Sequence, residues 1–254
     1  TQSRLVRYNE IMGYTKQAIA GFSWQSVLKV ATALLTLAKI SILARLLHPN
    51  DFGLFSLTAV ALCITESLTQ TGINLTIIQA KESVRYFLDT AWVIAIIRGL
   101  AIGVIMVGVA GGMGWWYQQP AIVPLIMVAA LVPVIKGFIN PAIVGLHKNL
   151  QFFQDSLYRF SLALVEAVVA VGAGMWLHSV WALLLGLLGA AVFEVVISFV
   201  YCKDKPSFRY SATKGATIIK NGRWLGIATI LNYLNENLDN VLLGKLVGTY
   251  QLGL

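Results

Sequence analysis

The chain has 254 residues, of which 57% are hydrophobic and only 12% are charged. With a mean hydropathy of +0.75 it has too few polar side chains to cover a soluble globule, so the composition predicts a membrane protein. Two cysteines exclude a disulfide-bonded secreted scaffold, and the net charge of +8 is not gathered on a polar domain, so we expect no nucleic-acid partner.

Seven apolar runs are long enough to cross the hydrocarbon core as helices, which takes roughly 20 residues per crossing. In chain order they cover residues 21–47, 52–78, 90–112, 122–146, 157–177, 180–201 and 224–247. These runs are apolar on every side, whereas the strands of a membrane barrel would alternate polar and apolar residues. The sequence therefore predicts an all-α, polytopic membrane protein.

Lysines and arginines lie only on alternate connections between these runs. One side holds Arg4, Arg7, Lys16, Lys81, Arg85, Lys148, Arg159, Lys203, Lys205, Arg209, Lys214, Lys220 and Arg223. The opposite loops, at residues 48–51, 114–121 and 178–179, contain neither lysine nor arginine. Because cytoplasmic loops carry the excess of basic residues, we expect a multi-pass protein of the plasma (inner) membrane with a cytoplasmic amino terminus and no signal peptide.

The first and seventh runs match each other at a constant offset of 200 residues. Residues 43–47 align with 243–247, residues 52–54 with 252–254, and Trp24 with Trp224. Chance similarity between apolar helices is the alternative to a parallel repeat about an axis along the membrane normal. The repeat divides the chain into a cytoplasmic segment (1–20), a six-helix lobe (21–201), a basic linker (202–223) and the first helix of a truncated second lobe (224–254).

A polar stripe runs along the first predicted helix. At about 100° per residue, the side chains of Gln25, Lys29, Thr32, Thr36 and Lys39 share an arc of about 80°. This arrangement favours a hydrated interior over lipid. In the seventh run, an acidic stripe is formed by Asn232, Asn235, Glu236 and Asp239, in which Asp239 corresponds to Lys39 at the offset of 200. The two stripes predict a cavity with a cationic and an acidic wall, and the alternative is that the acids are salt-bridge partners of the two lysines.

Other ionisable residues lie inside the second to sixth predicted spans, namely Glu66, Arg98, Lys136, Glu166 and Glu194. Snorkelling and pairing between helices are the alternatives to a cavity role. Lysine can hold an anionic head group such as a diphosphate, and a carboxylate in low dielectric can take up and release a proton or a sodium ion. We predict a substrate-binding cavity with Lys29, Lys39, Thr36, Arg98 and Lys136, ion-coupling candidates Glu66, Glu236 and Asp239, and no catalytic residue, metal or cofactor.

Four stretches of the chain, at residues 16–53, 71–79, 141–152 and 237–248, carry a family resemblance. The first includes Ala-Gly-Phe-Ser-Trp at 20–24 and Ile-Leu-Ala-Arg-Leu-Leu-His-Pro-Asn-Asp-Phe-Gly at 42–53. In these stretches the chain resembles the Wzx-like polysaccharide flippases of the MOP superfamily, and the resemblance extends over nearly the whole chain after residue 16.

The resemblance implies a two-lobe transporter that flips polyprenyl-diphosphate-linked oligosaccharides to the outer leaflet by ion-coupled alternating access. The implied partners are the lipid-linked oligosaccharide, the lipid bilayer and other polysaccharide-assembly membrane proteins. Cationic cavity residues hold the lipid diphosphate in the family, and Lys29, Lys39, Arg98 and Lys136 match this role by location. The chain departs from the pattern in length, so we expect that this part alone does not transport.

Three other functions stay open. A lipid II flippase or a multidrug exporter is the alternative within transport, although the exporter would favour acidic and aromatic cavity residues. A membrane-embedded glycan polymerase or ligase would need its site in the missing part, because the outer loops are short and almost uncharged. The third is a nonfunctional remnant. His48, His147 and His178 have no plausible catalytic partners in the sequence, so we expect no enzyme.

Overall fold

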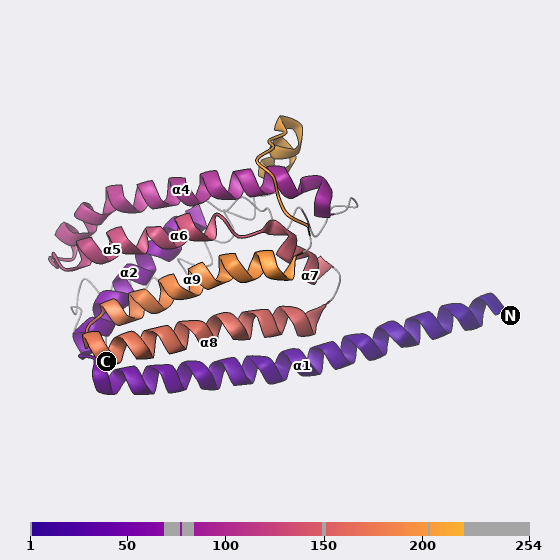
Figure 1. Ribbon diagram of the computed structural model, residues 1–254, viewed down its shortest axis with the longest axis horizontal. Helices are drawn as coiled ribbons and strands as arrows, with labels where there is room; N and C mark the ends of the chain where they lie inside the picture. The colour runs from indigo at the N-terminus through magenta and orange to yellow at the C-terminus, as the bar shows by residue number, and fades with distance from the viewer. Residues whose placement is uncertain (1, 69–76, 78–83, 149–150, 203, 221–254) are drawn as a thin grey trace.

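A computed structural model of the chain describes residues 2–68, 77, 84–148, 151–202 and 204–220, with side chains from residue 24 onward except at 66–68 and 147. All regular secondary structure in these ranges is helical (Figure 1). The segments Trp24–Leu46, Val84–Trp116, Phe152–Leu177 and Trp181–Tyr201 are long and apolar enough to cross a membrane, and Pro49–Thr65 and Ile122–Lys136 are shorter apolar helices. The chain is an all-α polytopic membrane protein, as its composition predicts.

The chain crosses the bundle back and forth (Figure 1). Its helical elements are α1 (Gln2–Leu46), α2 (Pro49–Leu68), α4 (Val84–Trp116), α5 (Ile122–Ala129), α6 (Leu131–Lys136), the 3-10 turn η1 (Pro141–Val144), α7 (Gly145–Lys148), α8 (Phe152–Leu177) and α9 (Trp181–Tyr201). Helices α5, α6 and α7 follow one another in the same direction. The turns between α1 and α2, α4 and α5, and α8 and α9 lie at one end of the bundle. These turns coincide with the loops that the sequence marks as lacking lysine and arginine.

The apolar core lies between α2, α4, α5, α6 and α9. Its fully buried side chains include Leu57, Ile102, Met106, Ile122, Ile126 and Leu184. Beside this core, α4 and α6 approach each other through glycines. A Cβ atom added at Gly99 would clash with the carbonyl oxygen of Pro133, and one added at Gly137 would lie 3.0 Å from the carbonyl oxygen of Ala95. Small residues therefore bring the two backbones into direct contact, as is common between membrane helices.

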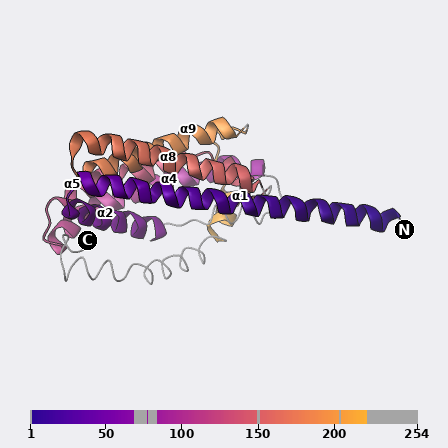
Figure 2. The same ribbon diagram turned by 90° about the horizontal axis from the view of Figure 1, so that it is seen from below.

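Helix α1 lies outside this core and packs mainly along α8, which itself lies between α1 and α9. Between Trp24 and Leu46 the single buried residue is Leu43, which packs with Leu47, Ala170 and Leu183. The rest of this segment exposes many apolar side chains, among them Val30, Leu34 and Leu37. Figure 2 shows that α1 continues past the bundle toward the amino terminus. The helix is thus attached to the bundle near its carboxyl end and along one face.

The first predicted span agrees with the structure, in which Trp24–Leu46 is apolar and long enough to cross a membrane. Helix α1 also includes residues 2–20 upstream of that span, a segment that contains no proline to stop it. The fourth predicted span, 122–146, is interrupted after Lys136. There the amides of Phe138 and Ile139 bond to carbonyls three residues back, and Pro141, which has no amide hydrogen, opens η1 instead of continuing α6.

The predicted second lobe lies outside the described residues. This applies to the seventh span at 224–247, to the acidic stripe with Glu236 and Asp239, and to the repeat at an offset of 200. The end of the second predicted span, 69–76 and 78, lies outside them as well, whereas the sixth predicted span ends where α9 ends, at Tyr201. The division of the chain into a lobe, a linker and a second lobe stays a prediction.

Candidate functional site

A groove with a volume of about 810 Å³ lies between α1 and the first turns of α8. The α1 side supplies Gln25, Leu28, Lys29, Thr32, Ala33, Thr36 and Leu37, and the α8 side supplies Asp155, Ser156 and Arg159. The groove thus gathers most of the polar stripe of α1 along one wall. It forms because the small side chains of Thr32, Ala33 and Thr36 leave space between two helices that are held together further along by Leu43.

The hydroxyl groups of the stripe are bonded within α1. Thr32 Oγ1 donates to the carbonyl of Leu28 at 2.8 Å, and Thr36 Oγ1 donates to the carbonyl of Thr32 at 2.9 Å. Bonds of this kind satisfy the hydroxyl hydrogen and leave the oxygen as an acceptor, so both threonines can face a groove inside the membrane. Lys29 is exposed and has no ion pair with any residue that the structure describes.

An ion pair borders the groove on the α8 side. The Asp155 carboxylate is buried, with the residue 5% exposed, and its Oδ2 atom accepts from Arg159 Nε at 3.0 Å, one helical turn further along. This contact orients the guanidinium group beside the groove. The described lining carries two cations, Lys29 and Arg159, against the one carboxylate of Asp155. The groove therefore has a net positive charge and attracts an anion.

A second ion pair joins α1 to α8 one turn beyond Thr36. Lys39 Nζ lies 2.6 Å from Glu166 Oε1, and the two side chains are 15% and 30% exposed. Two opposite charges in low dielectric satisfy each other, which lowers the cost of keeping either in a membrane-spanning helix. Of the alternatives that the sequence leaves open for Glu166, the structure shows pairing between helices, and it places Lys39 beside this acid.

The other predicted cavity residues lie away from the groove. Arg98 is on α4 and is partly buried, and Lys136 is the last residue of α6. The remaining acid, Glu194 on α9, accepts a bond of 3.4 Å from the Tyr158 hydroxyl. The structure brings Lys29 and Thr36 together in the groove, with Lys39 next to it, but it does not bring Arg98 or Lys136 there.

The ion-coupling candidates lie beyond what the structure describes. Glu66 is in α2, but its side chain is outside the described set, and Glu236 and Asp239 fall outside the described residues altogether. The correspondence between Lys39 and Asp239 at the offset of 200 therefore stays a prediction.

The sequence reasoning missed the whole α8 wall of the groove, which consists of Asp155, Ser156 and Arg159. The available signal was an acid and a base four residues apart at the start of an apolar run, which places both on one face of a helix. Arg159 was counted only as a marker of orientation. What the sequence could not show is that α8, rather than another span, lies beside the polar stripe of α1.

Comparisons with known proteins agree with the resemblance found in the sequence. The chain is 26% identical over 239 residues to the lipopolysaccharide biosynthesis protein WzxC of Escherichia coli, covering 93% of this chain and 49% of WzxC. It is 22% identical over 245 residues to the succinoglycan biosynthesis transport protein ExoT of Rhizobium meliloti, covering 94% of this chain and 48% of ExoT. An uncharacterized membrane protein in the cps region of Klebsiella pneumoniae is 24% identical over 253 residues, covering 95% of this chain and 50% of that protein.

The chain thus spans about half the length of the curated relatives it matches. No solved structure matches it significantly. A family model described as polysaccharide biosynthesis protein matches residues 42–254, which is most of the chain. The resemblance carried by residues 16–53, 71–79, 141–152 and 237–248 is confirmed, and the chain belongs to the polysaccharide biosynthesis protein family, together with Wzx-like membrane proteins.

Proposed function

We propose that the chain is part of a transporter that moves a polyprenyl-diphosphate-linked oligosaccharide across the plasma (inner) membrane during the synthesis of a surface polysaccharide. The observation that carries this proposal is the groove between α1 and α8, which places two cations and a polar stripe inside the membrane-spanning part of the bundle. Relatives named for lipopolysaccharide biosynthesis and for succinoglycan biosynthesis transport support export, and we assign the chain no enzymatic step.

The groove matches both halves of such a lipid. Lys29 acts as a point charge for the diphosphate, the guanidinium of Arg159 suits phosphate oxygens, and the Ser156 hydroxyl adds a donor. The apolar side chains of Leu28 and Leu37 lie among these polar groups and suit the prenyl chain. A lipid II flippase would use the same chemistry, whereas a multidrug exporter would favour an acidic and aromatic lining, and the described lining contains no aromatic residue.

The Lys39–Glu166 pair closes the groove toward the middle of the membrane in this proposal. While Glu166 neutralises Lys39 and Asp155 neutralises Arg159, the net attraction for an anion comes from Lys29. If this pair opened, Lys39 could bind the diphosphate, and the head group could move further along α1. Alternating access of this kind needs the second lobe, for which Glu66, Glu236 and Asp239 stay the proposed ion-coupling residues.

The orientation we propose puts the start of α8 at the cytoplasmic face. The described cations Lys148, Lys205 and Arg209 lie in connections at that end, and the turns at the other end have none. The groove then faces the leaflet in which a lipid-linked oligosaccharide is assembled. In whole cells, a cysteine placed at Ser179 should react with an impermeant maleimide, and one placed at Ala212 should react only after the cells are opened. The reverse pattern would contradict this orientation.

The binding step is tested with farnesyl diphosphate and farnesol as short-chain probes on the purified chain. Farnesyl diphosphate should raise the unfolding temperature of the wild-type chain, and farnesol should have a much smaller effect, because only the diphosphate meets Lys29 and Arg159. Lys29→Ala should weaken the response about tenfold or more, since a hydrogen bond to a charged group is worth ~1.5 to 3 kcal/mol. Arg45→Ala, which removes an exposed cation of α1 outside the groove, should leave it unchanged.

The transport step is tested in the full-length protein, in cells that depend on it for surface polysaccharide. Lys29→Ala and Lys39→Ala should each lower the amount of surface polysaccharide sharply at equal protein levels in the membrane, and Arg45→Ala should not. Normal polysaccharide in both variants would contradict the assignment of this groove. Equal stabilisation by farnesol and farnesyl diphosphate would contradict recognition of the diphosphate.

A further inference from the structure

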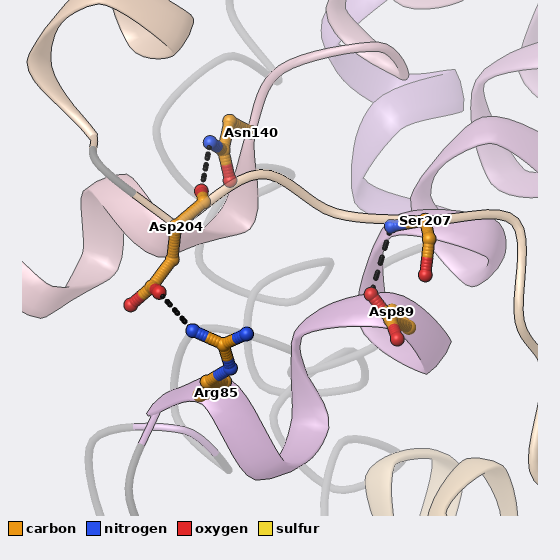
Figure 3. A network of polar contacts seen from close by, with 5 residues as sticks. All are labelled: Arg85, Asp89, Asn140, Asp204 and Ser207. Carbon is orange, nitrogen blue, oxygen red and sulfur yellow. Dashed lines mark hydrogen bonds and ion pairs between the residues drawn. The ribbon is translucent and has the colours of Figure 1, made fainter.

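Residues 204–220, which we call the strap, leave the end of α9 and run back over the beginning of α4 (Figure 1). Figure 3 shows contacts that hold the strap there, made by Arg85, Asp89 and Asn140. Arg85 Nη1 lies 2.8 Å from Asp204 Oδ1, and the amide of Ser207 donates to Asp89 Oδ1 at 2.8 Å. Further along, the amide of Ser211 donates to Thr90 Oγ1 at 3.2 Å. The first turns of α4 therefore fix the course of the strap along its first half.

The second half of the strap is held by a cation. Lys214 Nζ donates to the carbonyl oxygen of Tyr86 at 2.7 Å and lies 3.8 Å from the centre of the Tyr86 ring. At the other end of the strap, the buried Asn140 donates from Nδ2 to the carbonyl of Asp204 at 2.8 Å. The strap is thus attached at both ends to described elements of the bundle.

The exposed part of the strap is both aromatic and basic. Phe208 is 75% exposed although its ring centre lies 4.5 Å from that of Trp92, and Tyr210 and Ile219 are also exposed. The strap also carries the exposed cations Lys205, Arg209 and Lys220. The one acid of the strap, Asp204, is engaged by Arg85, so the outward charge is positive.

The position of the strap along α4 points to its partner. Beyond Trp92, α4 exposes apolar residues that include Ile97, Leu100 and Val104, as a helix in contact with lipid tails does. The strap lies where this apolar surface begins. Aromatic and long basic side chains are enriched at the membrane interface, where lipid tails meet the head groups.

We propose that the strap is a docking surface for anionic phospholipid head groups. Lys205, Arg209 and Lys220 bind the phosphates, and Phe208 and Tyr210 enter the boundary region. This assignment does not depend on the groove between α1 and α8 or on its ligand. A bilayer is favoured over an acidic protein because the exposed aromatic residues adjoin a helix that crosses the membrane.

The test places a fluorophore on the strap of the full chain at Ala216→Cys, with Cys63→Ala and Cys202→Ala. The protein is reconstituted in vesicles of phosphatidylcholine in which about a third of the lipid is phosphatidylglycerol. Bromine, which quenches the fluorophore, is carried either by the phosphatidylglycerol or by an equal amount of the phosphatidylcholine. Quenching by brominated phosphatidylglycerol should be the stronger, and the preference should fall about fivefold for each cation removed in the K205Q, R209Q and K220Q series.

Two controls keep the outcome decisive. A fluorophore at Ser179→Cys, at the end of the bundle without basic loops, should show no preference between the two brominated lipids. Raising the salt concentration should reduce the preference on the strap without any further substitution, which covers the case that the triple variant does not fold. Equal quenching by both lipids, or a preference that survives the three substitutions or high salt, overturns the proposal.

Discussion

The contacts α1–α8 and α4–α6 both join helices in the membrane, but they are built in opposite ways. The α4–α6 contact has backbone against backbone, with a Cβ at Gly99 excluded by the carbonyl of Pro133. The α1–α8 contact has a groove lined by polar side chains, an ion pair at Lys39 and a small apolar cluster around Leu43.

The difference indicates which helices can move relative to one another. Close-packed backbones have discrete arrangements and resist small shifts, so α4 and α6 should move as one body. Helix α1 is joined to α8 by side-chain contacts, namely the ring contact of Trp24 with Phe153, the Lys39–Glu166 ion pair and the apolar cluster around Leu43. Such contacts can change by rotation of side chains, and the strength of the ion pair depends on its surroundings. In the transport cycle proposed above, we expect the bundle to open at α1 and the glycine contact to stay intact.

The largest expected effect comes from breaking the ion pair on one side. Lys39→Ala leaves Glu166 charged without this partner and should lower the free energy of unfolding by about 3 kcal/mol. The double variant Lys39→Leu with Glu166→Leu removes both charges and should cost much less. Equilibrium unfolding in mixed micelles measures both, with Arg45→Ala as the control on the same helix. If the double variant were as unstable as the single one, the residues would matter for packing rather than charge.

The glycine contact should be next in size. Gly99→Ala forces a methyl group against the Pro133 backbone, which cannot rotate away, and should cost about 2 kcal/mol of stability. Gly108→Ala on the same helix meets no atom within 4 Å and should be neutral or raise stability by up to about 1 kcal/mol. The same unfolding assay compares the two. A stable Gly99→Ala variant would show that α4 and α6 can separate.

A smaller effect is expected at Asn140, which connects the interrupted fourth span to α9 and the strap. Its backbone amide donates to Ser198 Oγ at 3.0 Å, and its side-chain Oδ1 atom accepts from the backbone amide of Ala142 at 3.0 Å. Asn140→Ala should cost about 1 to 2 kcal/mol, because it removes the side-chain donor of the Asp204 carbonyl and the acceptor of the Ala142 amide at a buried position. Asn140→Asp keeps an acceptor for the Ala142 amide but loses the donor to the Asp204 carbonyl. Comparing the unfolding free energies of the two variants therefore separates the contributions of these two hydrogen bonds.

The smallest effect concerns the reactivity of Cys202, just after α9. Burial and the nearby charge of Asp204 raise the pKa of this thiol to about 11. Since the thiolate is the reactive form, alkylation by iodoacetamide should be slow at pH 8 and should speed up as the pH approaches 11. Asp204→Asn should shift that rise to lower pH. An unshifted profile in this variant would show that burial alone suppresses the reactivity.

The sequence predicted the helices more fully than it predicted the site. Runs of apolar residues are enough to locate α4, α8 and α9. The turns without lysine or arginine are enough to tell which ends of these helices lie on the same side of the bundle. The interruption after Lys136 needed more, because proline marks a weak point without saying whether the chain bends or leaves the helix. The helical periodicity of α1 predicted a polar face, and the structure shows a groove on that face.

The sequence does not predict which helix packs against the polar face of α1. Asp155 and Glu166 belong to a span that follows α1 by more than a hundred residues, and a single sequence carries no signal for which spans are neighbours. The same holds for the contacts of the strap, where Asp204 meets Arg85 across a separation of 119 residues. Partner choice between distant helices is set by packing over the whole bundle.

The length of α1 determines how far a tilt of this helix would displace the residues that line the groove. At 1.5 Å per residue, a helix of 45 residues is about 68 Å long, more than twice the thickness of the hydrocarbon core. Its buried point, Leu43, lies near one end, and Lys29 lies about 21 Å away along the axis. A tilt of about 10° about Leu43 would displace Lys29 by about 4 Å. Helix α1 is therefore long enough to act as a lever: a small rotation about Leu43 that breaks the Trp24–Phe153 ring contact would widen the groove at Lys29.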